Sequence, residues 1–516
     1  MNQCGMWNAE CGVHPVRSSE CGVRSGRHGS GGGAVLCFTP RSAPRIPHFL
    51  FTPHSALRTR HYPGTVLAAV LVVAALAATV AVSVLFMMRA EVGAEAARSR
   101  SEQAYNAAMS GMQFAMLLVA GSRDDPTVWY DNPDILKNRL VFDDGSDQWY
   151  FTVYADNQQD KEHSRFGLTD EASKLNLNEA DEETLRRMPA LPGELVDALL
   201  DWRDQDGETR SEGAEQDYYD TLPQPYTVRN GPLRTIEEAL LIKGFNAGVV
   251  YGEDANLNGL LDLNEDDGDD TFPPDDRDGS LNRGLYGLTT VWSWEPNTDR
   301  QGQARIDLNG AAAAIAGAGL SSSLMSFIAI YRAEGNRIAQ PSDLVEMQYQ
   351  VKQPHREFPE LRPGDVVVPA FEEADLAILM DRFTTSTGQK INGLVNVNTA
   401  RAEVLAALPG LDENLARQIV DVRTGLDPEA RGTTAWLYTS GVLDAAAFKA
   451  VAPKLTTRGF QYHVTCIGFG ARCGQYRIME GVVDLAEAQP RLVYLRDLTR
   501  VGPPFALNAD ELERSR

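Results

Sequence analysis

The chain has 516 residues and a formal net charge of −23 at pH 7, with 71 Asp and Glu against 48 Lys and Arg. Residues 1–64 are basic, with a net charge of +5, so the rest of the chain has a net charge of −28. This length allows two or three domains, and the acidic balance argues against nucleic acid as a partner, because phosphates are bound by Lys and Arg.

Residues 1–64 have the composition of a leader segment. They are rich in Gly, Ser, Arg and Pro and show no apolar periodicity, which predicts a mostly disordered cytoplasmic segment. A start codon assigned too early is the alternative. Four of the six cysteines lie here, but their spacing is irregular and no His pair accompanies them, which argues against a metal site: Cys4, Cys11, Cys21 and Cys37.

An uncharged run of 24 residues, 65–88, follows the leader. It exceeds the ~20 residues that one transmembrane helix requires. Arginines are concentrated before the run, so the positive-inside rule places the N-terminus in the cytoplasm and the body outside the cytoplasmic membrane, in the periplasm. A cleaved secretory signal is the alternative, but its apolar core is usually only about 7–15 residues long.

The helix predicted for this run continues beyond the membrane. Residues 89–119 contain no Pro and no turn signal. Small or apolar residues recur there at roughly helical spacing: Ala97, Ala104, Ala108, Met112, Ala115 and Leu118. The pattern predicts one helix from Thr65 to about Val119, half of it in lipid and half packed on the body.

A basic leader that ends in Gly before a long apolar helix resembles type IV pilins and the pseudopilins of type II secretion. The resemblance implies that a prepilin peptidase cuts between Gly64 and Thr65. Most members carry Glu at the fifth mature position, where this chain has Ala69. The minor pseudopilin K of type II secretion (general secretion pathway protein K) characteristically lacks that Glu, so the departure favours this subfamily.

Two segments of the body repeat at an offset of 220 residues. Residues 175–191 read LNLNEADEETLRRMPAL and residues 395–411 read VNVNTARAEVLAALPGL. Each predicts a short strand, a helix with an Asn at its N-cap (Asn178 and Asn398), and a second helix. The positions expected to be buried are Leu185, Met188 and Leu191 in the first copy and Leu405, Leu408 and Leu411 in the second. Residues 305–309 begin a third, degenerate copy that ends near residue 332.

The repeated unit resembles a helix-hairpin-helix, a motif that binds the DNA backbone through amide groups of its hairpin and through helix N-termini. The expected hairpins are residues 189–193 and 409–413. Acidic residues stand where a phosphate would need amides and cations: Glu194, Asp412 and Glu413. We therefore interpret the two units as packing modules, with DNA binding as the alternative.

The first repeat continues into an ordered set of strings: DWRDQD at 201–206, GAEQDYY at 213–219, NGP at 230–232 and IEEALLIKG at 236–244. This set is characteristic of the pseudopilin K family, and the resemblance covers about residues 64–500. It implies an α+β fold with a pilin-like long N-terminal helix, an antiparallel sheet and a large, mostly helical insert that contains the helix-hairpin-helix-like repeats. The sheet would use residues 148–155 and the C-terminal strands.

An acidic loop matches the pattern D-x-[DN]-x-[DN]-G-x5-E at every fixed position. In such a loop the oxygens of positions 1, 3, 5 and 9, a backbone carbonyl at position 7 and two oxygens of the final Glu surround one Ca²⁺. The predicted ligands are therefore Asp254, Asn256, Asn258, Leu260, Asp262 and Glu265. The alternative is a solvated acidic loop, because residues 253–282 contain a long run of acids with one base.

A second acidic cluster follows the loop. Its carboxylates offer ligands for another ion, but no spacing rule fixes which of them would bind: Asp266, Asp267, Asp269, Asp276 and Asp278. The family resemblance supports Ca²⁺ as the cofactor, because members of the family bind calcium in this helical domain. We expect the ion to order the insert, since like charges repel until a cation neutralises them.

Cys466 and Cys473 lie near the end of the chain, between two strand-like runs. A hairpin turn centred on Phe469 and Gly470 would place the two cysteines opposite each other. A disulfide is one hypothesis, because the compartment is oxidising, and two small half-buried thiols are the other.

Catalytic patterns were not found: the sequence has no Ser elbow, no HExxH and no phosphate-binding Gly loop. We expect a non-enzymatic minor pseudopilin, anchored by a single pass in the inner membrane, that caps the pseudopilus tip and supports export of folded proteins across the outer membrane. Expected partners are other minor pseudopilins, the type II secretion machinery, the prepilin peptidase and the inner membrane, without nucleic acid. The alternatives are a membrane-tethered DNA-binding protein of competence type and a generic calcium-dependent envelope protein.

The expected domain organisation follows these segments in chain order: leader, 1–64; transmembrane half of the helix, 65–88; soluble half, 89–120; first pilin-like strands, 121–174; first helical repeat unit, 175–252; acidic calcium loop, 253–284; middle helical region, 285–394; second helical repeat unit, 395–455; C-terminal pilin-like strands, 456–500; tail, 501–516.

Overall fold

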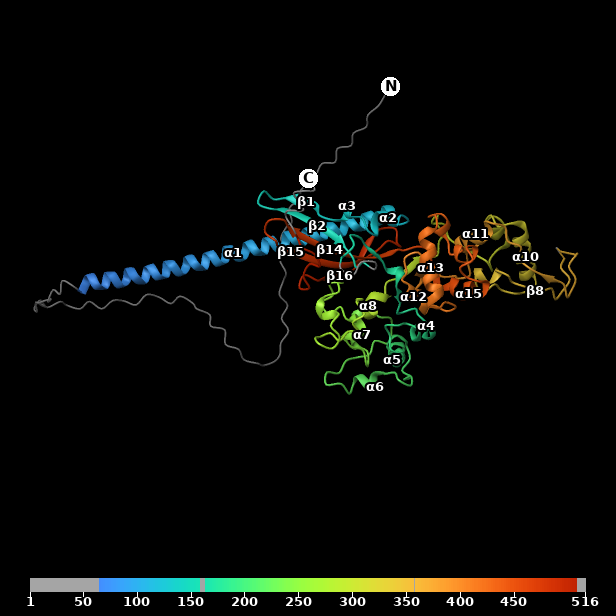
Figure 1. Cartoon of the computed structure of the whole chain (residues 1–516), viewed down its shortest axis with the longest axis horizontal. Coiled ribbons are helices and arrows are strands. Elements are labelled where there is room, and N and C mark those ends of the chain that lie inside the picture. The colour runs from blue at the N-terminus through green and yellow to red at the C-terminus, as the bar shows by residue number, and fades with distance from the viewer. Residues whose placement is uncertain (1–64, 158–162, 357, 508–516) are drawn as a thin grey trace, which may run out of the picture. The chain divides into compact units, whose positions relative to one another are not determined.

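The computed structural model describes residues 65–157, 163–356 and 358–507 (Figure 1). The predicted leader, with Gly64 and four cysteines, lies outside the described residues, as do residues 508–516 of the predicted tail. The chain divides into two compact units, Met1–Ala81 and Val82–Arg516.

Helix α1 (Thr65–Ser122) is continuous over 58 residues and begins with the uncharged run. Within the described residues it is the helix that is long and apolar enough to cross a membrane, by length and composition. Its first half exposes its apolar side chains. Its second half has a buried stripe with helical spacing, which packs against a sheet: Ala104, Ala107, Ala108, Gly111, Met112, Ala115 and Val119.

The sheet is antiparallel, with the strand order β1-β2-β14-β15-β16, and β3 also pairs with β14. Its strands are β1 (Arg139–Asp143), β2 (Gln148–Tyr154), β3 (Thr169–Asp170), β14 (Gln461–Gly470), β15 (Tyr476–Asp484) and β16 (Arg491–Asp497). β14 pairs with β2, which brings Cys466 opposite Val153, and the helical insert leaves the sheet after β3 and returns to it at β14. The long N-terminal helix and the antiparallel sheet confirm the predicted α+β class.

Helix α1 approaches β14 so closely that only glycine fits at the contact. A Cβ atom on Gly468 would lie 2.2 Å from the carbonyl oxygen of Ala104 and 2.3 Å from the backbone nitrogen of Ala108. On the helix side, a Cβ atom on Gly111 would lie 2.4 Å from Sγ of Cys466. Small residues on both elements therefore set the distance between the helix and the sheet.

The structure corrects the register on which the disulfide hypothesis depended. Strand β14 extends to Gly470, so the turn lies later than predicted, and Cys466 pairs with Met479. Cys473 lies in the turn, and both cysteines are free. Cys466 is buried under α1, where burial raises the pKa of its thiol.

Within its described residues the insert contains three pairs of short parallel strands, and two helices follow the first strand of each pair. β4 (Leu175–Asn176) pairs with β5 (Thr289–Thr290), β7 (Ile306–Asp307) with β10 (Phe383–Thr384), and β12 (Val395–Asn396) with β13 (Leu455–Thr456). The helices are α4 (Glu182–Arg186) and α5 (Gly193–Arg203), α9 (Ala312–Ala316) and α10 (Ser322–Ala333), and α12 (Ala402–Ala407) and α13 (Glu413–Gly425). The degenerate third copy thus has the same order of elements as the other two.

The six apolar positions predicted to be buried in the two main copies are all buried. They belong to one apolar core that extends through the insert. A separate core, which includes Met112, Phe151 and Val464, lies between α1 and the sheet. The predicted pattern of burial in the repeats is therefore confirmed.

The two asparagines predicted as N-caps have a different role. Asp181 caps α4 by accepting a hydrogen bond from the backbone N–H of Thr184, and Arg401 holds the cap position of α12. The Asn178 side chain instead donates to the carbonyl of Leu233 and accepts from its N–H. Asn309, in the third copy, makes the same pair of bonds with Ile338. Asn398 donates to the carbonyls of Arg431 and Thr457. Each of these asparagines therefore bonds to a distant segment of the chain.

The remaining described elements are α2 (Pro126–Trp129), α3 (Pro133–Leu136), η1 (Glu171–Ser173), α6 (Gln216–Tyr219), η2 (Ile236–Leu241), α7 (Ala247–Tyr251), η3 (Leu263–Glu265), α8 (Gly284–Leu288), β6 (Trp294–Pro296) paired with β11 (Lys390–Asn392), η4 (Pro341–Leu344), β8 (Tyr349–Gln350) paired with β9 (Val366–Val367), α11 (Asp375–Arg382), η5 (Ala430–Gly432), α14 (Trp436–Thr439), α15 (Ala445–Val451) and η6 (Ala452–Lys454).

Candidate metal centre

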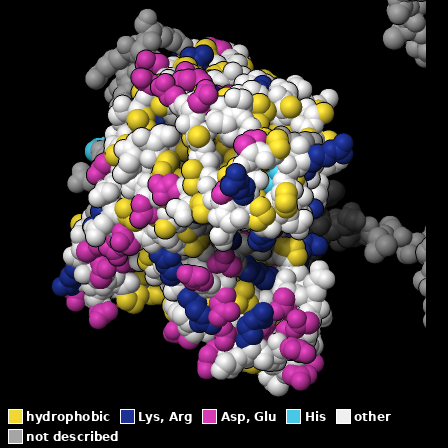
Figure 2. Space-filling view, turned by 90° about the vertical axis from the view of Figure 1, so that its right-hand side faces the viewer, with side chains coloured by type: hydrophobic (Ala, Val, Ile, Leu, Met, Phe, Trp, Pro, Cys, Tyr) yellow, Lys and Arg dark blue, Asp and Glu magenta, His cyan; other side chains and the backbone are white. Residues whose placement is uncertain are grey.

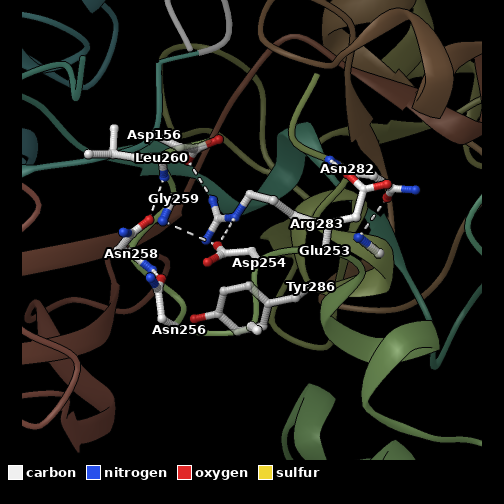
Figure 3. A network of polar contacts seen from close by, with 12 residues as sticks. Asp156, Glu253, Asp254, Asn256, Asn258, Gly259, Leu260, Asn282, Arg283 and Tyr286 are labelled. Atoms are coloured by element: carbon white, nitrogen blue, oxygen red, sulfur yellow. Dashed lines mark hydrogen bonds and ion pairs between the residues drawn. The ribbon is translucent and has the colours of Figure 1, made fainter. Parts of the chain in front are cut away.

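The acidic loop lies between α7 and α8 and folds back on itself (Figure 3). Gly259, at the sixth position of the motif, has φ of +71°, a conformation that glycine adopts without steric cost. The last positions form the short helix η3, whose first turn is closed by reciprocal bonds between Asp262 and Glu265. The loop therefore has the sharp turn and the compact end that the motif requires.

The first and last carboxylates of the motif are buried side by side. Asp254 and Glu265 are each 1 % exposed. Oε1 of Glu265 accepts a hydrogen bond from the N–H of Ala255, and Oε2 accepts one from the N–H of Asp262. These bonds bring the end of the loop against its beginning.

The middle positions of the motif also converge. The side-chain amides of Asn256 and Asn258 both donate to Oδ2 of Asp262, at 2.7 and 2.8 Å. Their side-chain oxygens accept backbone N–H groups two residues ahead, from Asn258 and Leu260 respectively. Leu260 and Leu261 are half-buried. The structure thus brings the predicted side-chain ligands of the loop into one small region.

Arg283, which the motif did not predict, contacts this region from the start of α8. Its Nε donates to Oδ2 of Asp254 at 2.9 Å, and its Nη1 lies 3.2 Å from Oδ1 of Asp156 (Figure 3). Its side chain is only 14 % exposed. Asp156 also forms an ion pair with Arg401, so this arginine pair links the loop to the end of β2 and to the second repeat.

The donor set fits a hard divalent cation. Oδ1 of Asp254 is buried without a hydrogen-bond partner among the described residues, although Oδ2 is bonded to Arg283. Burial raises the pKa of Glu265 to about 7, and burial also raises the pKa of Asp254. Buried carboxyl groups with unsatisfied oxygens are costly unless a cation pairs with them. Carboxylate, amide and carbonyl oxygens are the ligands that Ca²⁺ prefers.

The second acidic cluster is arranged around a residue that was not among its predicted ligands. Asp275 accepts backbone N–H groups of Asp267, Gly268 and Arg277. Asp267 bonds to Thr271, and the side chain of Asp266 accepts the N–H of Gly279. Asp269, Asp276 and Asp278 are exposed. Hydrogen bonds within the turn therefore account for much of this cluster, and a second ion there stays a prediction.

The hairpin turns of the two repeats contact each other through Arg187. Its guanidinium donates to the carbonyls of Ala406, Leu408 and Leu411, which lie in and beside the hairpin of the second repeat. Gly410 in that hairpin has φ of +77°, and a Cβ atom there would lie 2.8 Å from Ala450. The second hairpin thus packs in part against other parts of the insert, while Gly410, Asp412 and Glu413 stay exposed. The predicted processing site has only Thr65, the first residue of α1, within the described residues.

Comparisons with known proteins identify two segments of the insert. Residues 173–251 match a family model described as type II secretion system (T2SS), protein K, and residues 395–457 match a second model with the same description. A comparison with curated proteins finds no match. Among solved structures, the chain is similar to the GspK-GspI-GspJ complex from the enterotoxigenic Escherichia coli type 2 secretion system. The identity is 12 %, the TM-score is 0.38, and the match covers 78 % of this chain and 99 % of that chain.

Proposed function

Because this chain belongs to the type II secretion system protein K family through both matched segments, we propose that it is a minor pseudopilin of a type II secretion system. The observation that carries the proposal is the position of these segments. Both lie in the insert between β3 and β14, and α1 packs its small-residue stripe on the sheet that this insert interrupts. A non-enzymatic role in assembly accords with this architecture.

The anchor is proposed to be the first half of α1, which crosses the inner membrane once, with the N-terminus in the cytoplasm and the body in the periplasm. The uncharged run and the basic leader support this orientation. A prepilin peptidase would release the mature chain at Thr65. Mass spectrometry of the membrane protein tests this step, and the mature N-terminus is expected at Thr65. A chain that keeps residues 1–64 in cells with an active peptidase contradicts the proposal.

A place at the pseudopilus tip is proposed from two features. Ala69 stands where most pseudopilins have the Glu that pairs with the N-terminus of the subunit ahead, and a tip subunit has no subunit ahead. The insert, which contains three strand–helix–helix units, is too large to be buried inside a filament. Its partners would then be other minor pseudopilins, and the complex would support export of folded proteins. Antibodies against the insert should label one end of extended pseudopili, and labelling along their length contradicts this placement.

The hairpins support packing rather than DNA binding. Arg187 of the first repeat is bonded to carbonyls of the second hairpin, so this arginine is not free for phosphate. On the face shown in Figure 2, Asp and Glu side chains stand in several groups, with Lys and Arg side chains between them. An excess of negative charge repels the DNA backbone. The helix-hairpin-helix-like units are therefore proposed to be structural.

The acidic loop is proposed to bind Ca²⁺ through Asp254, Asn256, Asn258, Asp262, Glu265 and the carbonyl of Leu260. The meeting of the Asn256 and Asn258 side chains at Asp262 and the unpartnered Oδ1 of Asp254 support this role. The ion would neutralise the carboxylates and hold α7 and α8 together. Ca²⁺ at ~100 times its Kd should stabilise the folded chain by roughly 2.7 kcal/mol, because it binds the folded state alone.

Thermal melting of the full chain in detergent, with Ca²⁺ or with chelator, tests the loop. The wild-type chain should melt at a higher temperature with Ca²⁺, and Glu265→Gln should remove most of the difference. Glu183→Gln, which removes an exposed carboxylate on α4, is the matched control and should keep the wild-type response. Identical wild-type melting curves with Ca²⁺ and chelator would return the segment to a solvated loop.

A further inference from the structure

The second strands of the three parallel pairs all end in a threonine that makes the same turn. Thr290, Thr384 and Thr456 are the last residues of β5, β10 and β13. Oγ1 of each accepts the backbone N–H of the residue two positions ahead, at 3.0, 3.0 and 3.2 Å respectively. All three threonines are buried. The repeated fold therefore places a buried hydroxyl group, with a proton to donate, at the same point in each copy.

In two of the three copies a buried glutamate accepts the proton of this hydroxyl. Thr290 donates to Oε2 of Glu171, and Thr456 donates to Oε2 of Glu295 at 2.8 Å. Each of these glutamates also lies within 3.4 Å of two basic side chains, which are Lys174 and His463 for the first and Arg305 and Arg458 for the second. A carboxylate between basic groups is thus the usual partner of this threonine.

The third copy has the threonine but lacks the carboxylate. Thr384 is 7 % exposed, and its hydroxyl proton has no acceptor among the described residues. Thr384 lines a cavity of about 180 Å³ between the third copy and the second repeat. Asp307, which stands opposite Thr384 in the β7–β10 pair, accepts the N–H of Asn309 and does not line this cavity. The position of the glutamate is therefore open to a ligand.

A second hydroxyl of the cavity wall also lacks a partner. Ser342, in η4, lines the cavity and is only 1 % exposed. Its Oγ is buried and has no hydrogen-bond partner among the described residues. Buried polar groups are nearly always hydrogen-bonded in folded proteins. The hydroxyls of Ser342 and Thr384 thus both indicate a hydrogen-bond acceptor inside the cavity.

The wall of this cavity is also rich in arginine. Arg300, Arg305 and Arg458 line it, and Asp381 is the one carboxylate among its described lining residues. Oδ1 of Asp381 accepts the backbone N–H of Arg300 at 2.9 Å. Arg305 and Arg458 share Oε1 of Glu295, and Nη2 of Arg305 makes no hydrogen bond among the described residues. Two guanidinium groups with one carboxylate between them favour an anion in the cavity.

Another part of the wall is apolar and suits a short hydrocarbon chain. Met380, Ile391 and Leu394 line the cavity and are half-buried. A cavity of about 150 Å³ is large enough to hold a benzene molecule, so this cavity can hold a carboxylate that carries a few carbon atoms. Ser386, which also lines it, is exposed, so solvent reaches the cavity. The wall therefore matches a small amphipathic anion.

We propose that the cavity between the third copy and the second repeat binds a carboxylate group that carries a short aliphatic chain. The carboxylate accepts the hydroxyl protons of Thr384 and Ser342 and pairs with Arg305, so it occupies the position that Glu171 and Glu295 hold in the other two copies. A free short-chain acid and the C-terminal residue of a polypeptide offer this same chemistry. The site lies apart from the acidic loop and does not depend on the proposed role in secretion.

Ligand-observed NMR of the full chain in detergent tests the proposal, with butyrate as the probe and protein-free detergent as the blank. Saturation transfer to butyrate should appear with the chain. The neutral isostere butyramide should bind roughly tenfold or more weakly, because it cannot form charge-assisted hydrogen bonds. Thr384→Val and Ser342→Ala, which each remove one hydroxyl, should weaken butyrate binding by roughly the same factor. Thr439→Val changes an exposed threonine on α14 outside the cavity, and this matched control should bind butyrate like the wild-type chain.

A peptide probe distinguishes the two sources of the carboxylate. The tripeptide alanyl-alanyl-leucine, with a free C-terminus, is compared with butyrate and with its own C-terminal amide, and the acid that binds more tightly identifies the source. An absence of transfer to both acids overturns the proposal, and so does butyramide that binds as tightly as butyrate. Equal affinity for butyrate in the wild-type chain, Thr384→Val and Ser342→Ala overturns it as well, whatever the chain does in secretion. If Thr384→Val does not fold, Ser342→Ala alone decides.

Discussion

Arg203 and Arg423, which are 220 residues apart, make the same pair of hydrogen bonds in the two repeats. Arg203 donates to the carbonyls of Leu177 and Ala180, and Arg423 donates to those of Val397 and Ala400. In both cases an arginine near the end of the second helix satisfies carbonyls that follow the first strand. Arg332 in the third copy donates to the carbonyl of Gly310. The repeats are thus related by a shared internal bond as well as by sequence.

Replacing Arg423 should destabilise the second repeat. Arg423→Leu removes two charge-assisted hydrogen bonds and leaves two carbonyls without these partners, so we expect a loss of about 2–4 kcal/mol in the free energy of unfolding. Urea unfolding followed by circular dichroism measures it. Arg417→Leu, on the same helix, is the control, because its pair with Glu413 is exposed and should contribute less than about 0.5 kcal/mol. Equal losses in the free energy of unfolding for the two variants would show that the buried bonds of Arg423 stabilise the repeat no more than an exposed ion pair does.

The close contact between α1 and β14 predicts that position 468 requires glycine. Gly468→Ala places a methyl group against the backbone of α1, so we expect it to push helix and sheet apart and cost about 1–3 kcal/mol. Gly93→Ala, in the same helix, meets nothing within 4 Å and should stabilise the helix by about 0.5–1 kcal/mol. Thermal melting should give a lower melting temperature than the wild-type chain for Gly468→Ala and a higher one for Gly93→Ala. A harmless Gly468→Ala would mean that this helix does not pack as closely as described.

His463 connects the sheet to the insert and gives the chain a predicted pH dependence. His463 lies on β14, with its Nδ1 3.4 Å from Oε1 of Glu171 and its Nε2 3.0 Å from Oε1 of Glu480. Lys174 and Tyr286 also face the imidazole ring. Burial alone would lower its pKa, but the hydrogen bonds to Glu171 and Glu480 raise the pKa of His463 to about 9.

Because the folded pKa of His463 is above the unfolded value of ~6.5, its contribution to stability is fully present below pH ~6.5 and is lost as the pH rises through about 9. The loss is at most about 3.5 kcal/mol, at ~1.4 kcal/mol per pKa unit. Melting temperatures measured from pH 6 to 10 should fall more steeply for the wild-type chain than for His463→Gln. Parallel curves would show that this histidine is not ionised at neutral pH.

Arg283 should contribute most to the thermal stability of the chain when calcium is absent. Arg283→Gln leaves Asp254 and Asp156 without this cation, and breaking such a buried pair costs about 3–5 kcal/mol. In chelator the variant should melt well below the wild-type chain, and Ca²⁺ should restore part of the loss by pairing with Asp254. Arg277→Gln removes an exposed pair with Asp270 and serves as the control. A variant that melts like the wild-type chain in chelator would contradict the role given to Arg283.

Features that are encoded within short segments could be predicted from the amino-acid sequence alone. Periodicity along one stretch was enough to predict α1, because helix formation and burial of one face depend on residues three and four positions apart. The repeats, and the burial of Leu185 and Leu405 in them, followed from the same local patterns. The motif of residues 254–265 identified the residues that the structure brings together, because a loop of this length fixes its own ligands through spacing.

Contacts between groups that are distant in the sequence could not be predicted before the fold was known. The sequence could not show that Arg283 contacts Asp254, that Asn178 bonds to Leu233, or that Cys466 stands opposite Met479. These contacts depend on how the chain returns after a turn or an insert, and one residue of shift in a turn moves a side chain to the other face of a strand. Local patterns do not contain that information, because it arises from packing between segments.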